Sequence, residues 1–162
     1  MCGMGMLTED MQRLVREQRL GFHATVDEDG TPNLSPKGTT GVWDDDHLFF
    51  VHVRSPQTVA NVRRGSWVEV NVVDPFVRKG YRFKGPAVVH DHGTAAFGDG
   101  IRRIREAGVA TPDERIKAIV VIEVRLARPV VSPAYDDGAR DEAHVARQWQ
   151  EHFDRLRASR TP

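Results

Sequence analysis

Basic and hydroxyl side chains gather in three short segments of this 162-residue chain: NLSPKG at 33–38, SPQTVANVRRG at 55–65 and RKGYRFKG at 78–85. In an extended segment, residues two apart share a face, so Ser35 and Lys37 project together from the first of these. In the third, Lys79 lies at the entrance of a predicted strand that also carries Lys84. Ammonium and hydroxyl groups of this kind bind phosphate through charge-assisted hydrogen bonds.

The middle segment has the chemistry of a helix start. Ser55 suits the capping position, Pro56 suits the first helical position, and Thr58 follows two residues later. The first amides of a helix have no partner within the helix and lie at the positive end of its dipole, so they bind anions. Two interpretations remain open from the residues alone: an anion site, or a connecting helix beside solvated lysines and arginines.

Composition excludes several other classes of function. The chain has 23 basic and 23 acidic residues, so it lacks the net positive field that drives nonspecific nucleic-acid binding. We find no P-loop and no paired cysteine motif, and although His90 and His92 share a strand face, we predict no metal site. With the single Cys2 and no apolar run of roughly 18 residues, we expect a cytoplasmic protein with no membrane segment.

Hydrophobic periodicity predicts a mainly β chain with flanking helices. Residues after Thr8 repeat at helical spacing, and from Phe22 the period changes to two. Six strands are expected, at FHATV, PNLSPKG, LFFVHV, SWVEVNVVD, GYRFKGPAVVH and AIVVIEVRLARPVV. Short antiparallel strands with few helices favour a small barrel over a doubly wound parallel sheet.

Two further helices are expected in the second half of the chain. The segment GTAAFGDGIRRIREAG at 93–108 predicts a helical excursion between the last two strands. In the C-terminal segment, Val145, Trp149, Phe153 and Leu156 form one apolar stripe of a helix that packs in this subunit or against another. We divide the chain into a disordered leader at 1–6, a barrel domain at 7–133 and a helical extension of the same domain at 134–162.

The order of these motifs resembles the flavin-binding split-barrel family related to pyridoxamine 5'-phosphate oxidase, over roughly Leu7 to Val131. The most specific parts are the hairpin DEDGTPNLSPKG and the later S-x-x-T-x-x-N-x-R helix with its valine-rich strand. The resemblance implies a six-stranded antiparallel split β-barrel with N-terminal and C-terminal helices. It also implies a homodimer that holds FMN at the subunit interface.

The resemblance also implies where FMN binds. Residues of the second strand, the third strand end, the helix start and the later basic segment would contact it: Ser35, Lys37, Val51, His52, Ser55, Gln57, Thr58, Lys79, Gly80 and Lys84. Main-chain groups near Val51 and His52 would run along the flavin ring, and the later basic residues could come from the other subunit.

The family resemblance leads to an FMN-dependent oxidoreductase with a small-molecule electron donor and acceptor. Its substrate is unassigned, because the vitamin-forming oxidases carry an Arg and Lys pair where this chain has Ser35, Pro36 and Lys37. The C-terminal helix also lacks their substrate-binding pattern. The alternative is a carrier, sensor or stress protein that binds flavin, a deazaflavin or haem without turnover.

Overall fold

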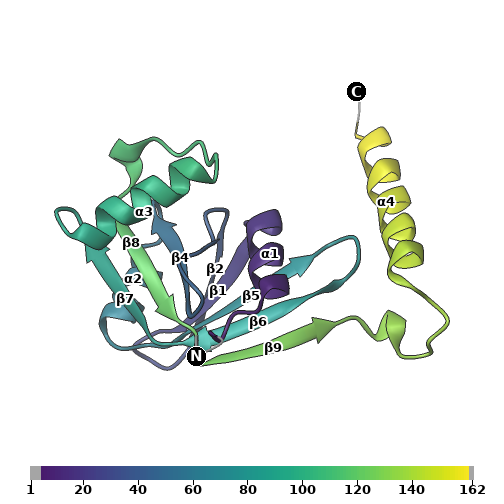
Figure 1. Cartoon of the computed structure of the whole chain (residues 1–162), viewed down its shortest axis with the longest axis horizontal. Helices are drawn as coiled ribbons and strands as arrows, with labels where there is room; N and C mark the ends of the chain where they lie inside the picture. The colour runs from purple at the N-terminus through teal and green to yellow at the C-terminus, as the bar shows by residue number, and fades with distance from the viewer. Residues whose placement is uncertain (1–4, 161–162) are drawn as a thin grey trace.

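The structure of the chain is a computed structural model that describes residues 5–160. Within that range nine strands form two antiparallel sheets, with strand orders β2-β1-β5-β6-β9 and β3-β4-β8-β7 (Figure 1). The strands are β1 (Gly21–Val26), β2 (Pro32–Lys37), β3 (Gly41–Val42), β4 (His47–His52), β5 (Val68–Asp74), β6 (Lys79–Gly85), β7 (Ala87–Asp91), β8 (Ala118–Glu123) and β9 (Leu126–Val131). The α-helices are α1 (Glu9–Gln18), α2 (Pro56–Arg63), α3 (Ala95–Glu106) and α4 (Glu142–Ala158), and short 3-10 turns lie at Asp113–Arg115 and Pro133–Tyr135. The prediction of a mainly β split barrel with flanking helices is confirmed.

Two of the six predicted strands are each divided between the sheets. Pro86 has no backbone N–H to continue a ladder, and there the chain leaves β6 in one sheet and enters β7 in the other. The later strand divides at Val124, between β8 and β9. The two crossings run side by side, since the Glu123 amide donates to Pro86 O at 2.9 Å and a Cβ on Gly85 would lie 1.8 Å from Glu123 O. The short β3 is a further strand that the pattern did not predict.

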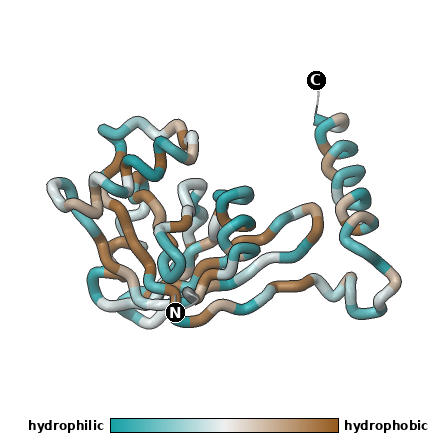
Figure 2. The backbone as a smooth tube through the Cα atoms, in the orientation of Figure 1, coloured by the Kyte–Doolittle hydropathy of each residue, from teal (hydrophilic) through white to brown (hydrophobic). Residues whose placement is uncertain are grey.

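The main core lies between the two sheets and under α1. Central strands β5, β6, β4 and β8 supply Val68, Val70, Val72, Phe83, Leu48, Phe50, Val120 and Ile122, all fully buried. Thr8 caps α1, as its position predicts, by accepting from the Met11 amide at 3.4 Å. The other face of β4 and β8 packs under α3, so these two strands are apolar on both faces, and the tube in Figure 2 is brown along them.

Strand β1 buries its polar face and exposes its apolar one. His23 and Thr25 are 0% and 2% exposed, whereas Phe22 and Val26 are 45% and 52% exposed. In the β1–β2 register, His23 pairs with Ser35 and Thr25 with Asn33, so the polar residues of both strands face inward together. A buried polar layer of this kind departs from ordinary core packing and is costly unless its groups are hydrogen-bonded.

The C-terminal arm stands apart from the sheets at the opposite end of the molecule from α3 (Figure 1). It is held by the β5–β6 hairpin, where the Phe153 ring lies 5.6 Å from Phe76 and the Arg78 guanidinium lies 3.4 Å above the Trp149 ring. Val145 is also buried. The predicted amphipathic helix is confirmed, and its apolar stripe is largely covered within one chain.

Most of the predicted leader, residues 1–4, lies outside the described residues. At its end, the Met6 amide donates to Asp46 Oδ1 at 2.7 Å. Over residues 5–160, no helix combines the length and the hydropathy that a membrane crossing requires.

Candidate functional site

The buried polar residues converge where the β1–β2 hairpin meets α2 and the end of β4. Among the described residues they are His23, Thr25, Lys37, Thr40, His52, Ser55, Thr58 and Asn61. Four predicted site residues are among them: Lys37, His52, Ser55 and Thr58. A fifth, Val51, is buried at the edge of this region, next to His52 on β4. The structure therefore brings together the early part of the predicted site.

Lys37 is the positive centre of this region. Its side chain is 4% exposed, its ammonium hydrogen-bonds to Ser35 Oγ, and Nζ lies 5.4 Å from the centre of the Phe50 ring. No carboxylate forms an ion pair with Lys37 among residues 5–160. Burial lowers the pKa of Lys37 to about 8, so near neutral pH it carries a buried charge that an anionic ligand would neutralise.

His23 lies next to Lys37 and is completely buried. Its Nε2 is 2.8 Å from Thr40 Oγ1, and its ring meets Phe50 edge-on at 4.7 Å. Burial, and then the charge of Lys37, lowers the pKa of His23 to about 3. Its Nδ1 is buried and has no hydrogen-bond partner within the described structure. This ring nitrogen could therefore form a hydrogen bond with a bound ligand.

The start of α2 differs from the start of every other α-helix that the structure describes. Thr8, Thr94 and Asp141 each accept a hydrogen bond from the first turn of their own helix, but Ser55 does not. The Ser55 amide instead donates to His52 Nδ1 at 3.2 Å. The Ser55 hydroxyl and the first amides of α2 are thus left for another acceptor, as an anion site requires.

A groove of about 340 Å³ opens beside this helix start. It is lined by His52 and Pro56 together with the basic side chains of Arg63 and Lys117. Arg63 also binds Asp91 across the groove at 2.7 Å. Burial, and then the nearby cations Lys117, Lys37 and Arg63, lowers the pKa of His52, so the neutral imidazole is favoured.

Gln57 and Thr58 form internal hydrogen bonds that hold α2 to the hairpin. Thr58 Oγ1 accepts from Asn33 Nδ2 at 3.2 Å, and Gln57 Nε2 donates to Asp27 Oδ1 at 3.0 Å. Asn61 completes the set, because its Nδ2 donates to Asp27 Oδ1 at 2.6 Å and to Thr25 Oγ1 at 2.9 Å. These side chains position the start of α2, and their predicted contact with phosphate stays a prediction.

The backbone of β4 is partly open on one edge. The short β3 pairs with β4 at Leu48 and Phe49, and beyond that point the Val51 amide donates to Thr39 Oγ1 at 3.0 Å. On the other side, the His52 carbonyl accepts from the Lys117 amide at 2.8 Å. The strand end predicted to face a flavin ring therefore meets the loop after β2.

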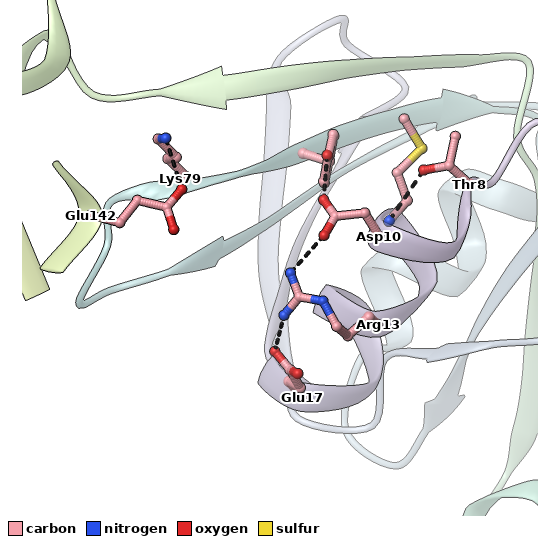
Figure 3. Close-up of polar contacts among 8 residues, drawn as sticks. Thr8, Asp10, Arg13, Glu17, Lys79 and Glu142 are labelled. Carbon is pink, nitrogen blue, oxygen red and sulfur yellow. Dashed lines mark hydrogen bonds and ion pairs between the residues drawn. The ribbon is translucent and has the colours of Figure 1, made fainter. Parts of the chain in front are cut away.

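Lys79, Gly80 and Lys84 do not join this region within one chain. Lys79 and Gly80 lie at the β5–β6 hairpin near α4, away from α2 (Figure 1). Lys79 Nζ donates to Glu142 Oε1 at 2.8 Å (Figure 3). It also lies 4.3 Å from the centre of the Tyr135 ring. Lys84 pairs with Glu69 at 3.3 Å on the outer face of the sheet. The hydrogen bond to Glu142 is the main cause that raises the pKa of Lys79.

Sequence reasoning missed His23, Thr25, Thr40 and Asn61 as members of the site. A signal was present in the hairpin: in antiparallel pairing, His23 and Thr25 fall opposite Ser35 and Asn33. The face of β2 that carries Asn33 and Ser35 was already predicted to be polar. The residues of β1 that pair with them lie on the same face of the sheet, so this face of β1 is polar too. Asn61 is the asparagine of the S-x-x-T-x-x-N-x-R motif, but neither it nor Thr40 carries a register signal, because the packing of α2 and of the β2–β3 loop brings them in.

Several solved structures are similar to this chain in fold and sequence. No protein of curated function matches this sequence. Among solved structures, HupZ from Group A Streptococcus is 30% identical and superposes with a TM-score of 0.67, covering 78% of this chain and 96% of its own. An FMN-binding protein from Syntrophomonas wolfei is 19% identical with a TM-score of 0.60, covering 78% of this chain and 87% of its own. An F420 reductase is 21% identical with a TM-score of 0.59, covering 75% of this chain and 98% of its own.

The family model for pyridoxamine 5'-phosphate oxidase matches residues 7–128. This range contains both sheets except the end of β9, all of α1, α2 and α3, and the buried polar region around Lys37 and His23. It agrees with the range over which the sequence motifs predicted the resemblance. The chain therefore belongs to the pyridoxamine 5'-phosphate oxidase family.

Proposed function

We propose that the protein binds FMN and acts as an FMN-dependent oxidoreductase in the cytoplasm, with a small-molecule electron donor and acceptor. The observation that carries the proposal is Lys37, a buried ammonium without a carboxylate partner in the described chain, beside the uncapped start of α2. A buried charge of this kind destabilises a protein unless a ligand compensates it. The similarity in fold to an FMN-binding protein and an F420 reductase supports a cofactor of the flavin type.

The residues fit a flavin phosphate in their chemistry. Ser55 and the first amides of α2 would donate to the phosphate, with Gln57 and Thr58 holding the helix start in place. Lys37 would stabilise negative charge on the cofactor, and the backbone of β4 near Val51 and His52 would border its ring. When bound, FMN supplies the hydride or electron transfer, and the protein supplies position, electrostatics and shielding from water.

We also propose a homodimer with the cofactor at the subunit interface. The outward face of the β1–β2 hairpin supports it, because Phe22, Val26 and Leu34 are 45%, 52% and 65% exposed on neighbouring strands. An apolar face of this kind is typical of an interaction site. In the dimer, Lys79, Gly80 and Lys84 would come to the site from the partner subunit, since one chain does not bring them there.

The second candidate function is a carrier, sensor or stress protein that binds FMN, a deazaflavin or haem without turnover. His23 favours it, because a histidine with a pKa of about 3 is neutral near pH 7 and is poorly matched to act as a general acid there. The only histidine at the neighbouring helix start among the described residues, His52, also has a lowered pKa. Hydride transfer that needs no protein acid remains compatible with both residues.

Reconstitution of the purified protein with FMN tests the two functions. Saturable binding with a shifted flavin absorbance spectrum is expected for both, and a Soret band after incubation with haem would identify the haem alternative. Anaerobic bleaching of the bound flavin by NADH or NADPH, followed by reoxidation with an acceptor, would support the oxidoreductase. Absence of any flavin binding at micromolar FMN would contradict the proposal.

A further inference from the structure

A second pocket, separate from the groove at α2, lies between α1, the β2–β3 segment and α3. Its volume is about 420 Å³, which is within the size range of small-molecule sites. Its lining includes Thr39, Thr40, Trp43 and Phe49 together with three arginines: Arg16 of α1, Arg19 directly after α1, and Arg103 of α3. None of the residues predicted to bind FMN lines this pocket.

The pocket has an aromatic wall with a guanidinium above it. The rings of Trp43 and Phe49 meet edge-on with their centres 5.6 Å apart. The Arg103 guanidinium lies 4.6 Å from the centre of the Trp43 ring. An aromatic corner beside a planar cation is suited to a planar aromatic ring, which can pack against either aromatic ring or stack on the guanidinium.

Three arginines and three carboxylates line this pocket, and the buried donor without a partner in the described structure belongs to an arginine. Arg103 Nε is buried without a hydrogen-bond partner in the described structure, and neither Arg103 nor Arg19 forms an ion pair there. Asp44 and Asp45 also line the pocket, but their side chains already accept hydrogen bonds. Of the lining carboxylates, Glu106 alone accepts no hydrogen bond within residues 5–160, and it lies in the exposed last turn of α3.

We propose that this pocket binds a planar aromatic carboxylate. The ring would lie against Trp43 and Phe49, and the carboxylate would accept from Arg103 and Arg19, which satisfies the buried Nε. Arginine is suited to this task, because its planar fork of donors matches a carboxylate.

The pocket shares a wall with the candidate cofactor region. Thr39 accepts from the Val51 amide at 3.0 Å, and Thr40 Oγ1 lies 2.8 Å from His23 Nε2. A ligand in the pocket would therefore lie one layer of residues from the region assigned to FMN. Thr40 belongs to both regions, but no residue assigned to contact FMN lines this pocket, so the binding proposal does not depend on FMN.

Calorimetric titration of the full chain with 2-naphthoate, without added FMN, tests the proposal. Saturable binding is expected, and 2-naphthalenemethanol, a neutral molecule with the same ring, should bind at least about tenfold more weakly, since it lacks the charged acceptor. Arg103→Gln should weaken naphthoate binding by about 10- to 100-fold. Arg102→Gln is the matched control on the same helix, because Arg102 is exposed and pairs with Asp99, and it should change the affinity less than about twofold.

A second variant guards against loss of folding in the first. Arg19 has a left-handed backbone (φ 56°), which asparagine tolerates well, so Arg19→Asn should preserve the fold. This variant should weaken naphthoate binding several-fold. Equal binding of naphthoate and the neutral alcohol would overturn the proposal. So would unsaturable binding at millimolar naphthoate, or equal affinities for Arg103→Gln and Arg102→Gln when both variants show wild-type circular dichroism. Flavin absorbance is recorded in a separate titration, so a failure to bind FMN is distinguished from a failure of this pocket.

Discussion

At the scale of single residues, Lys37 and His23 show chemistry that folding alone does not explain. Both are buried at one place, one carrying a charge without a carboxylate partner and the other a ring nitrogen without a donor or acceptor among the described residues. Buried groups left in this state destabilise the fold by a few kcal/mol. A ligand that satisfies both would offset this cost.

Replacing Lys37 separates stability from binding. Because burial lowers the pKa of Lys37 from 10.5 to about 8, Lys37→Met should raise the free energy of unfolding of the cofactor-free protein at pH 7 by about 1–2 kcal/mol. The same variant should weaken FMN binding by about 10- to 100-fold, because a bond to a charged group is lost. Urea denaturation and flavin titration measure the two effects.

The lowered pKa of Lys37 also makes the free energy of unfolding depend on pH. Between about pH 8 and 10.5 the unfolded wild-type chain keeps a proton on Lys37 that the folded chain releases, so stability from this group rises with pH, and Lys37→Met removes the rise. Arg147→Met, an exposed change on α4, should alter neither stability nor FMN binding. A Lys37→Met protein with undiminished FMN affinity would refute the assigned role.

His23 should make the protein acid-sensitive. Its pKa is about 3 in the folded chain and 6.5 in an unfolded one, so its contribution to stability is present above pH 6.5 and is lost as the pH falls toward 3. At pH 5 the loss amounts to about 2 kcal/mol relative to pH 7.5. In His23→Gln, the fall in unfolding free energy between these two pH values should be smaller by that amount, as measured by urea denaturation.

A matched change checks that this acid sensitivity belongs to the buried ring. His144 is an exposed histidine at the start of α4, and His144→Gln should leave the difference in stability between pH 7.5 and 5 as it is in wild type. The same difference in His23→Gln and wild type would mean that His23 is accessible to protons in the folded chain.

At the scale of elements, Gly80 has a clear structural role in joining β5 to β6. A Cβ at this position would lie 2.1 Å from Val72 O and 2.7 Å from Val73 Cα, both on the backbone of the neighbouring strand. Backbone atoms cannot move away as the end of a flexible side chain can. The approach of the two strands therefore requires glycine whether or not this residue also contacts a cofactor.

Substituting Gly80 should weaken the sheet. Gly80→Ala is expected to lower the free energy of unfolding by about 3 kcal/mol or more, because the strands must separate locally. Gly98→Ala is the opposite control: a Cβ there has no atom within 4 Å, and alanine favours the helix by about 0.5–1 kcal/mol. Thermal denaturation should thus move in opposite directions for the two variants, and a wild-type melting temperature for Gly80→Ala would contradict the strand-contact role.

At the scale of the whole molecule, the outward β1–β2 face bears on the proposed dimer. The sequence left open whether the apolar stripe of the C-terminal helix packs in this subunit or against another. The structure covers Trp149 and Phe153 with the β5–β6 hairpin, and only Leu156 of the stripe is left exposed, at 37%. The apolar surface that supports the proposed dimer is instead that of Phe22, Val26 and Leu34, which are among the exposed large apolar side chains.

Charging the outward hairpin face should break the dimer. Leu34→Glu combined with Val26→Lys is expected to convert a dimer to a monomer in analytical ultracentrifugation, because dimerisation would bury charged side chains in the core of the interface. FMN affinity should fall along with dimerisation if the partner subunit contributes to the site. Val88→Glu, at a residue 58% exposed on β7 of the other sheet, is the control and should sediment as wild type. A wild-type chain that is a monomer at all concentrations would contradict the dimer.

The sequence by itself determined the order and kind of most elements. Local spacing and helix-start residues, which act over a few positions, predict α1, the helix that begins after Ser55, the hairpin of β1 and β2 and the amphipathic α4. The motifs that carry the family resemblance are local in the same sense. For this reason Lys37, Ser55 and the end of β4 were predicted to lie near one another.

Only the tertiary structure decided which of those residues meet. Alternation cannot say which face of β1 is buried, and packing against α2 turned its polar face inward, which added His23 to the site. The crossings at Pro86 and Val124 carry the chain between sheets, and the length of the β5–β6 hairpin holds Lys79 away from Lys37. Likewise, Arg103 reaches Trp43 from a helix distant in sequence. Each of these depends on strand register and on contacts between segments far apart in the chain, which no local pattern specifies.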